Sequence, residues 1–173
     1  MTKRVLGFIL VGLLLIFFGI WIFSFNKTKA VQVIPQVATL PTATSLSTFA
    51  KVTRVIDGDT IVVDTGQKIR YIGVNTPETE TLECYATEAG EINKNLVLEK
   101  VVRLEKDVSE TDKYGRLLRY VYVDNHFVND ELVKEGAAKI ETVSPDIKYK
   151  KLFLESQNYA KENNLGLWSK CFK

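Results

Sequence analysis

The chain has 173 residues, of which 46% are hydrophobic and 25% are charged, a composition that fits a globular protein and excludes a disordered one. Lys and Arg number 23 against 21 Asp and Glu, so the formal net charge is only +2. Within residues 49–173 the balance is 19 basic against 21 acidic side chains. Net charge therefore cannot hold a polyanion to this part of the chain, and only a local basic cleft could do so.

Residues 5–25 contain no charged side chain and are apolar throughout except for Ser24. At about 1.5 Å per residue, a helix of this length spans about 31 Å, enough to cross the hydrocarbon core of a membrane. A cleaved signal peptide is the alternative, but Lys29 lies where a cleavage site needs small residues. Lys3 and Arg4 weakly favour an inside N-terminus. We therefore predict that residues 1–25 are a single-pass anchor in the cell membrane.

Residues 26–48 differ in composition from the segments on either side of them. They are rich in Thr, Ser, Ala and Val, include Pro35 and Pro41, and show no hydrophobic periodicity. This composition is typical of an extended tether. We predict a flexible linker here, followed by one globular domain at residues 49–173.

The chain has two cysteines, Cys84 and Cys171, and neither lies in a C-x-x-C motif or near the single histidine at metal-ligand spacing. A zinc site is therefore not expected. An even pair suits a disulfide that attaches the C-terminal tail to the domain in an oxidising compartment, although two unrelated thiols in a cytosolic protein are the alternative. In the chain-entropy model, closing this loop would stabilise the fold by about 4 kcal/mol. Together with the anchor, the pair favours an extracellular domain, which would be secreted if the N-terminal segment were cleaved.

Short runs of β-branched residues, broken by turn signals, predict strands at 51–56, 60–63, 67–74, 101–105, 117–123 and 127–128. Helical spacing predicts helices at 86–98, 130–135 and from 145 or 146 to 163. Asn129 would cap the second helix, and the third would bury a stripe made of Ile147, Leu152, Phe153 and Ala160. Five strands besides the two-residue segment 127–128, with interspersed helices, favour an α+β, mainly β fold: a five-stranded OB-fold barrel with about three helices, preceded by the transmembrane helix. Periodicity alone does not separate this barrel from other α+β folds.

Chemistry-bearing residues gather at the ends of the predicted strands. Asp57 and Asp59 flank Gly58, a spacing that can aim two carboxylates at one cation, although an ordinary hairpin turn is the alternative. Arg70 is on the same face of its predicted strand as two apolar residues, so it is either a structural ion pair or a phosphate ligand. We interpret His126 as a solvated turn residue.

Three separated motifs, 57–60, 70–78 and 112–116, follow one another in the order D-G-D-T, R-Y-I-G-V-N-T-P-E and D-K-Y-G-R. Together they resemble the thermonuclease (staphylococcal nuclease-like) family. The resemblance runs from about residue 51 to residue 136 and continues more loosely to the C-terminus. It implies an OB-type barrel and Ca²⁺-dependent hydrolysis of phosphodiester bonds in DNA and RNA.

Carried over by position, the resemblance implies a Ca²⁺ site. Asp59 would be a direct ligand, Thr76 a second ligand through its carbonyl, and Asp57 an outer-shell residue. Asn75 stands where the family has a third carboxylate, so the ligand set keeps an oxygen but loses one negative charge. We therefore expect weak affinity, about 10⁻⁴–10⁻³ M as in extracellular modules.

The resemblance also implies catalytic and substrate-binding residues. Glu78 corresponds to the general base that deprotonates the attacking water, and Arg70 and Arg116 correspond to the arginines that hold the scissile phosphate. Lys113 and Tyr114 would contact phosphate or sugar. These roles agree with phosphoryl transfer, in which positioning and charge stabilisation dominate.

Thr142 and Ser144 stand where the resemblance leads one to look for tyrosines beside the nucleotide, and this loss of stacking would weaken nucleoside binding rather than the chemistry. The sequence thus predicts a monomeric nuclease of low sequence specificity that prefers single-stranded DNA and RNA. Because the same fold also serves binding functions, a noncatalytic OB-type nucleic-acid-binding module is the alternative.

Overall fold

The computed structural model describes residues 47–172. The predicted anchor lies outside the described residues, as does the predicted linker except for its last two positions. Within the described range, no helix combines the length and the apolar character that a membrane span would need.

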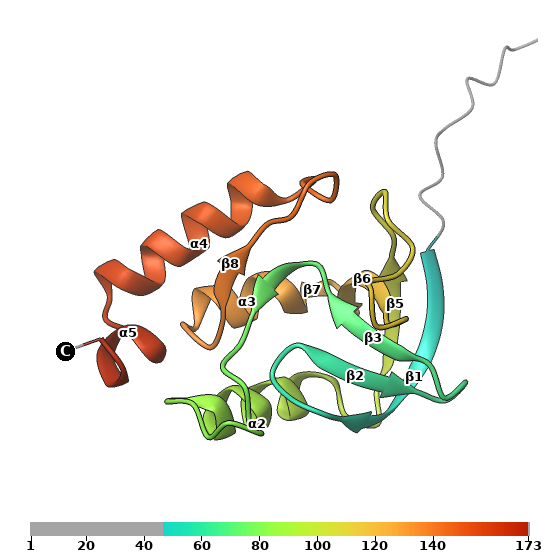
Figure 1. The fold of residues 1–173 in the computed structure, drawn as a ribbon, viewed down its shortest axis with the longest axis horizontal. Helices are drawn as coiled ribbons and strands as arrows, with labels where there is room; N and C mark the ends of the chain where they lie inside the picture. The colour runs from blue at the N-terminus through green and yellow to red at the C-terminus, as the bar shows by residue number, and fades with distance from the viewer. Residues whose placement is uncertain (1–46, 173) are drawn as a thin grey trace, which may run out of the picture. The chain divides into compact units, whose positions relative to one another are not determined.

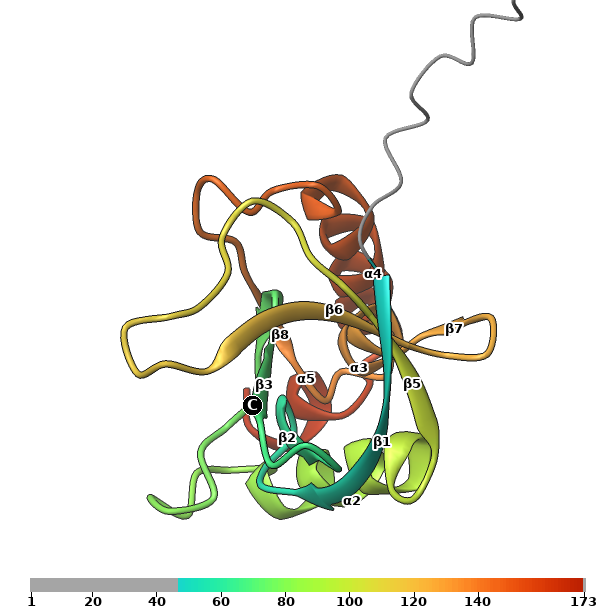
Figure 2. The ribbon, with the colours of Figure 1, turned by 90° about the vertical axis from the view of Figure 1, so that its right-hand side faces the viewer.

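Five strands form a closed barrel (Figures 1 and 2). They are β1 (Ser47–Val55), β2 (Thr60–Val63), β3 (Lys68–Tyr71), β5 (Val101–Glu105) and β6 (Leu117–Val123). Strand β1 pairs antiparallel with both β2 and β5, β2 pairs with β3, and β5 pairs with β6. A parallel pairing of β3 with β6 closes the ring. The predicted five-stranded barrel is confirmed.

The barrel interior is filled by apolar side chains from every second residue of the strands. In β2 and β3, Ile61, Val63, Ile69 and Tyr71 are almost fully buried. Val52, Val102, Leu104 and Val121 complete this layer from the other strands. Alternation with period two places these side chains on the inner face of each strand, so the β-branched runs of the sequence become one core.

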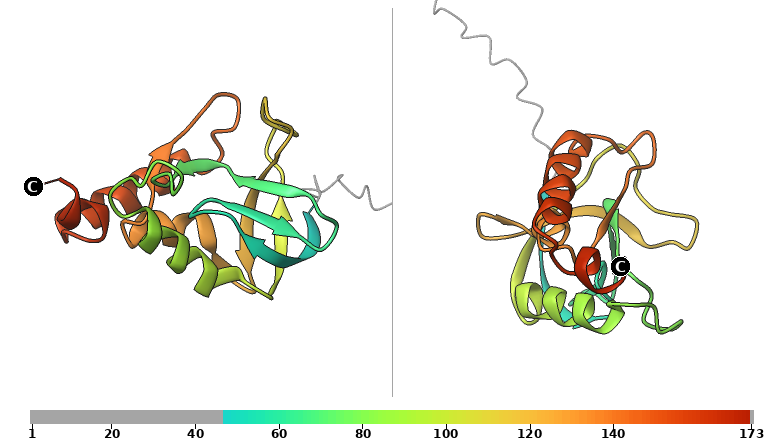
Figure 3. Two further views of the ribbon diagram at one scale, coloured as in Figure 1. Left: turned by 60° about the horizontal axis from the view of Figure 1, so that its bottom comes forward. Right: turned by 90° about the vertical axis from the view of Figure 1, so that its left-hand side faces the viewer.

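The helices surround this barrel, and their residue bounds are close to the predicted ones. They are α2 (Ala86–Val97), α3 (Val128–Lys134), α4 (Lys150–Glu162) and the short α5 (Leu167–Lys170). Helix α4 lies at the top and α2 at the bottom in Figure 1 and in the right-hand view of Figure 3. The predicted hairpin is present, with β7 (His126–Phe127) paired to β6, and His126 is exposed in it.

Three details of the predicted helices are wrong: the cap of α3, the start of α4 and part of its buried stripe. Asn129 does not cap α3, which begins one residue earlier; it is fully buried, where its amide donates to the Ile72 carbonyl at 2.9 Å and its Oδ1 accepts from the Val121 N–H at 2.9 Å. These two backbone partners satisfy both the amide donor and the carbonyl acceptor of the buried Asn129 side chain.

Helix α4 begins at Lys150, later than predicted, because Asp146 is engaged elsewhere. Its Oδ1 accepts from the N–H groups of Val108 and Ser109 at 2.9 and 2.8 Å, which holds the segment before the helix in turns. The predicted buried stripe is correct for Phe153 and Ala160 but wrong for Ile147 and Leu152, which are exposed.

The predicted strand 67–74 is divided in two. After β3 the chain breaks at Ile72 and continues as β4 (Gly73–Asn75), which pairs antiparallel with a strand not foreseen from the sequence, β8 (Lys139–Glu141). Gly73 permits the break because its φ is +81° and because a Cβ there would come within 2.5 Å of the Phe153 ring. The β4–β8 sheet places the region after residue 136 beside the end of β3.

The predicted disulfide is confirmed: Cys84 is bonded to Cys171 across 87 residues of sequence, with Cα atoms 5.8 Å apart. The bond joins the segment before α2 to the tail that follows α5. The C-terminal tail is therefore covalently attached to the domain.

Candidate active site

The turn between β1 and β2 brings the first acidic motif against the end of β4. Gly58 is essential to this packing, because a Cβ at that position would lie 2.6 to 2.8 Å from the Thr76 side chain. The Asp57 carboxylate closes the turn by accepting from the Asp59 N–H at 3.0 Å. Asp57 thus forms the turn, and Asp59, two residues later, contacts the end of β4.

A buried asparagine of α2 fixes this turn from below. Asn93 donates from its amide to the Asp57 carbonyl at 3.0 Å and accepts from the Tyr71 hydroxyl at 2.9 Å. Sequence reasoning missed Asn93, although its spacing from the buried residues Ala89 and Val97 places it on the inner face of the helix.

The Asp59 carboxylate is buried and surrounded by donors. Its Oδ2 accepts from the Thr76 N–H at 2.7 Å and from the Thr76 hydroxyl at 3.0 Å. Its Oδ1 accepts from the Thr60 hydroxyl at 3.2 Å and lies 3.1 Å from Arg70 Nη1. Burial nevertheless raises the pKa of Asp59 to about 6, against the opposing effect of Arg70. Arg70 therefore offsets only part of the cost of burying this charge.

Arg70 extends from β3 and is held on several sides. Nη1 donates to the carbonyls of Tyr71 and Val74 at 3.0 and 2.7 Å, and Nη2 donates to Asn75 Oδ1 at 2.8 Å. Glu141 of β8 also approaches Nη2, at 3.4 Å. The sequence left open whether Arg70 forms a structural ion pair or binds phosphate. In the structure its guanidinium is ion-paired with Asp59 and also lines a pocket, so both roles are open to it.

Arg116 comes to the same region from the turn before β6. The Asp112 carboxylate folds this turn by accepting from the N–H groups of Tyr114 and Arg116 at 2.9 and 3.0 Å. Its other oxygen accepts from Arg116 Nε at 2.7 Å. Arg116 Nη1 reaches the Thr60 hydroxyl at 3.3 Å, which links it to the residue that also contacts Asp59.

Glu78, the last residue of the second motif, is exposed. Its backbone is held, because its N–H donates to Glu83 Oε2 at 3.2 Å and its carbonyl accepts from the Glu83 N–H at 3.2 Å. Within residues 47–172 its carboxylate takes part in no hydrogen bond or ion pair. Glu78 is therefore positioned by its main chain while its carboxylate stays available to solvent.

A pocket of about 560 Å³ opens beside the two arginines. Lys113 and Tyr114 line it as well, and both are exposed, with Lys113 Nζ 5.0 Å from the centre of the Tyr114 ring. Ser144 lines the pocket, whereas Thr142 does not. Glu141, which no sequence motif selects, also lines the pocket because the β4–β8 pairing brings it there.

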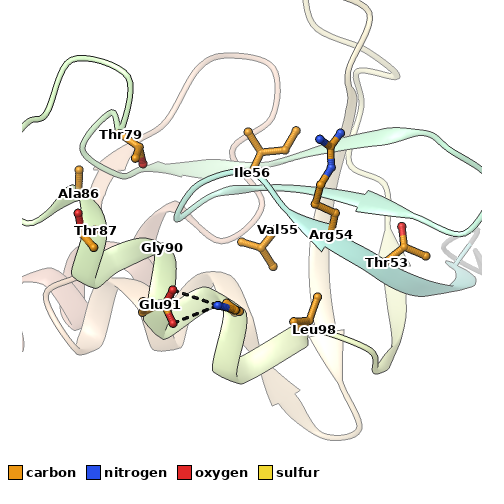
Figure 4. Close-up of a pocket in the computed structure, with 11 residues that line it drawn as sticks. Thr53, Arg54, Val55, Ile56, Thr79, Ala86, Thr87, Gly90, Glu91 and Leu98 are labelled. Carbon is orange, nitrogen blue, oxygen red and sulfur yellow. Dashed lines mark hydrogen bonds and ion pairs between the residues drawn. The ribbon is translucent and has the colours of Figure 1, made fainter.

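A second hollow, of about 410 Å³, lies between β1 and α2 (Figure 4). Its charged groups do not converge: Glu91 is paired with Lys94 at 3.1 Å, and Arg54 points away from α2. This hollow has no buried carboxylate comparable to Asp59. The pocket beside the arginines is therefore the candidate active site.

A Ca²⁺ ion takes six to eight oxygen ligands. Within the described residues, no group of three or more His, Cys, Asp and Glu side chains could hold a metal ion. Asp59 offers one carboxylate, and Asn75 and Thr76 offer neutral oxygens; a cation beside Asp59 would oppose the burial that disfavours its charge. These residues fit a weakly bound, water-rich Ca²⁺ site.

Comparison with known proteins relates this geometry to a family. The model of the family described as staphylococcal nuclease homologue matches residues 68–170. The thermonuclease of Staphylococcus hyicus is 40% identical over 126 residues, which cover 69% of this chain and 75% of that protein. Endonuclease YncB of Bacillus subtilis is 44% identical over 126 residues, which cover 68% of this chain and 60% of that protein.

Proposed function

The chain belongs to the staphylococcal nuclease family and is a nuclease, and from this premise we propose that it hydrolyses phosphodiester bonds in DNA and RNA in a Ca²⁺-dependent reaction. One observation carries the proposal. Arg70 and Arg116 come from different parts of the barrel and line the same pocket, and Arg70 is paired with the buried Asp59.

The two arginines would bind the scissile phosphate. A guanidinium presents planar donors that match phosphate oxygens, and donors fixed before the reaction stabilise developing charge without reorganisation. Arg70 is fixed by the carbonyls of Tyr71 and Val74, and Arg116 by Asp112. Both would therefore bind phosphate at little cost in side-chain entropy.

Glu78 would act as the general base. Its carboxylate would take a proton from the attacking water, whose oxygen forms the new bond to phosphorus while one ester P–O bond breaks. A base that is free of hydrogen bonds can accept this proton without first losing a partner.

Asp59 and Asn75, with the Thr76 carbonyl, would hold the Ca²⁺ ion, and Asp57 would support them from the outer shell. When bound, the ion supplies Lewis-acid polarisation and neutralises negative charge at the phosphate. Asp59 would then exist fully ionised, since the cation opposes the burial that raises its pKa.

Low sequence specificity and a preference for single strands complete the proposal. Low specificity would follow because the three cations that line the pocket, Arg70, Lys113 and Arg116, contact phosphate, which carries no sequence information. We further propose that residues 5–25 tether the monomeric enzyme to the outer face of the cell membrane. The alternative function is a noncatalytic nucleic-acid-binding module.

The direct test is hydrolysis of matched single-stranded DNA, single-stranded RNA and duplex DNA by the full-length protein in detergent, with Ca²⁺ or with a chelator. We expect release of acid-soluble nucleotides from both single strands only with Ca²⁺. Binding without hydrolysis under every condition would instead support the noncatalytic module. Arg54→Lys provides a matched control, because Arg54 lines the other hollow and its substitution should leave the rate unchanged.

A further inference from the structure

Four side chains form a continuous stack at the C-terminal end of the domain. Phe172 and Trp168 are stacked with ring centroids 5.1 Å apart and planes 24° apart. Lys139 Nζ lies 4.8 Å from the centroid of Phe172, and Lys161 Nζ lies 4.6 Å from that of Trp168. We call this set the cation–aromatic row: a cation, two rings and a second cation.

The row is joined to the candidate active site through β8. Lys139 is paired directly with Asn75 across the β4–β8 sheet, so their side chains are neighbours on one face. Asn75 and Glu141 both contact Arg70 Nη2, which identifies this face as the one that carries the phosphate-binding arginine. None of the four row residues lines the pocket beside Arg70. The row therefore extends the site in a direction that the pocket does not cover.

Solvent reaches the row, and covalent structure fixes its position. Phe172 is 53% exposed, Lys139 and Lys161 are exposed, and Trp168 is partly exposed. The Cys84–Cys171 disulfide ends next to Phe172 and holds this end of the chain to the domain. Figure 3 shows α5 and the C-terminus together at one end of the domain, next to α4. An exposed aromatic residue fixed in this way is available to a ligand.

We propose that the cation–aromatic row is a second nucleic-acid subsite, which binds the nucleotides of a single strand that continues past the scissile phosphate. Two stacked rings flanked by cations suit this ligand, because a base would take the place of Lys139 or Lys161 on the outer face of a ring while the displaced ammonium group contacts a phosphate. Continuity with Arg70 through Asn75 and Lys139 favours the substrate strand over any other anionic partner. The subsite rests on the proposed nuclease function, and it deepens that function by predicting a preference for strands longer than a dinucleotide.

The test compares two substrates with full-length protein in detergent. Binding of a fluorescent single-stranded 12-mer is measured by anisotropy in a Glu78→Gln background, which prevents turnover. In that background Phe172→Ala should weaken binding by about 5- to 10-fold, which corresponds to the lower end of the stacking free energy of one base on an aromatic ring. Adding Lys139→Gln and Lys161→Gln should make the log–log salt slope less steep by about 1.4, since each phosphate contact on a single strand contributes about 0.7.

Hydrolysis is then measured with Glu78 intact. The Phe172→Ala and double-lysine variants should raise KM for the 12-mer while cleaving a dinucleotide at the unaltered rate. The matched control is Lys134→Gln, which removes a cation 5.5 Å from the Tyr159 ring outside the row and should change neither value. An unchanged 12-mer affinity and salt slope in the row variants would overturn the subsite. Absence of hydrolysis of either substrate would contradict the proposed function but leave the binding result readable.

Discussion

Arg70 and Glu78 lie within one motif of the sequence but in opposite physical environments. Arg70 donates to two backbone carbonyls and to Asn75, and it is ion-paired with the buried Asp59. The Glu78 carboxylate is exposed, and the described part of the chain offers it no partner. The contrast suggests a division of labour. Charge stabilisation requires groups that do not move, whereas proton transfer requires a base that is not already engaged.

The largest expected effect comes from removing the base. Glu78→Gln should lower kcat by about 10²–10⁴-fold, the usual contribution of a positioned general base. Thermal unfolding should be unchanged, because the Glu78 carboxylate supports no other group. Steady-state kinetics and a melting curve measure the two effects. Glu80→Gln, an exposed acid two residues further on, is the control and should remain fully active.

The next largest effect should follow from altering the fixed side of the comparison. Arg70→Lys should lower kcat/KM by about 10²–10³-fold, because an ammonium cannot reproduce the planar donors of the guanidinium. Unlike the Glu78 variant, it should also melt earlier, since Asp59 loses part of its pairing. A variant that melted at the unaltered temperature would show that the contacts of Arg70 do not support the fold.

A smaller effect should come from the missing charge at the metal-ligand position. Asn75→Asp should tighten Ca²⁺ binding by about tenfold, because affinity in oxygen-ligand sites rises with ligand charge. Isothermal titration with Ca²⁺ measures this directly. Asn125→Asp makes the same charge change in the β6–β7 turn and should have no effect on affinity. Equal affinities in all three proteins would remove Asn75 from the ligand set.

The smallest effect concerns stability and its pH dependence. Burial disfavours the charge of Glu105, but hydrogen bonds from Lys148, Arg103 and Tyr149 outweigh it and hold the pKa below the ordinary value of 4.5. Because the pKa is lower in the folded state, its contribution is present above pH 4.5 and is lost as the pH falls through the folded pKa.

Glu105→Gln should therefore cost about 1 kcal/mol at pH 7, an estimate reduced for the partly exposed partners. The difference in free energy of unfolding between the two proteins should shrink below pH 4.5. Urea unfolding at pH 7 and at pH 3.5 measures it. A difference that stayed constant between these pH values would contradict the assigned ion pairs.

The sequence predicted the parts of this molecule that local pattern determines. Alternating β-branched residues predicted the barrel strands, and the helical spacing of Ala89 and its neighbours predicted α2. The disulfide could be predicted because only one pairing of two cysteines exists. Three motifs sufficed to select Arg70, Lys113, Tyr114 and Arg116, which line one pocket, and Asp59 and Asn75, which contact Arg70.

What the sequence could not predict depends on contacts between distant segments. Strand β8 is too short for a periodicity signal, and it exists because β4 pairs with it. The sequence does not show which backbone groups Asn93 and Asn129 bind, because their partners lie on distant segments of the chain. Glu141 reaches Arg70 only through the β4–β8 register, across 71 residues of sequence.

The most direct test of the division of labour is the binding of a single-stranded oligonucleotide by two variants, measured by anisotropy in the presence of Ca²⁺. We predict that Glu78→Gln, which arrests turnover, binds it tightly, since a negative charge has been removed beside the phosphate. Arg70→Lys should bind it about tenfold or more weakly, since a hydrogen-bonded charge contact is lost. Equal affinities of the two variants would contradict the account, because Arg70 would then not hold the phosphate.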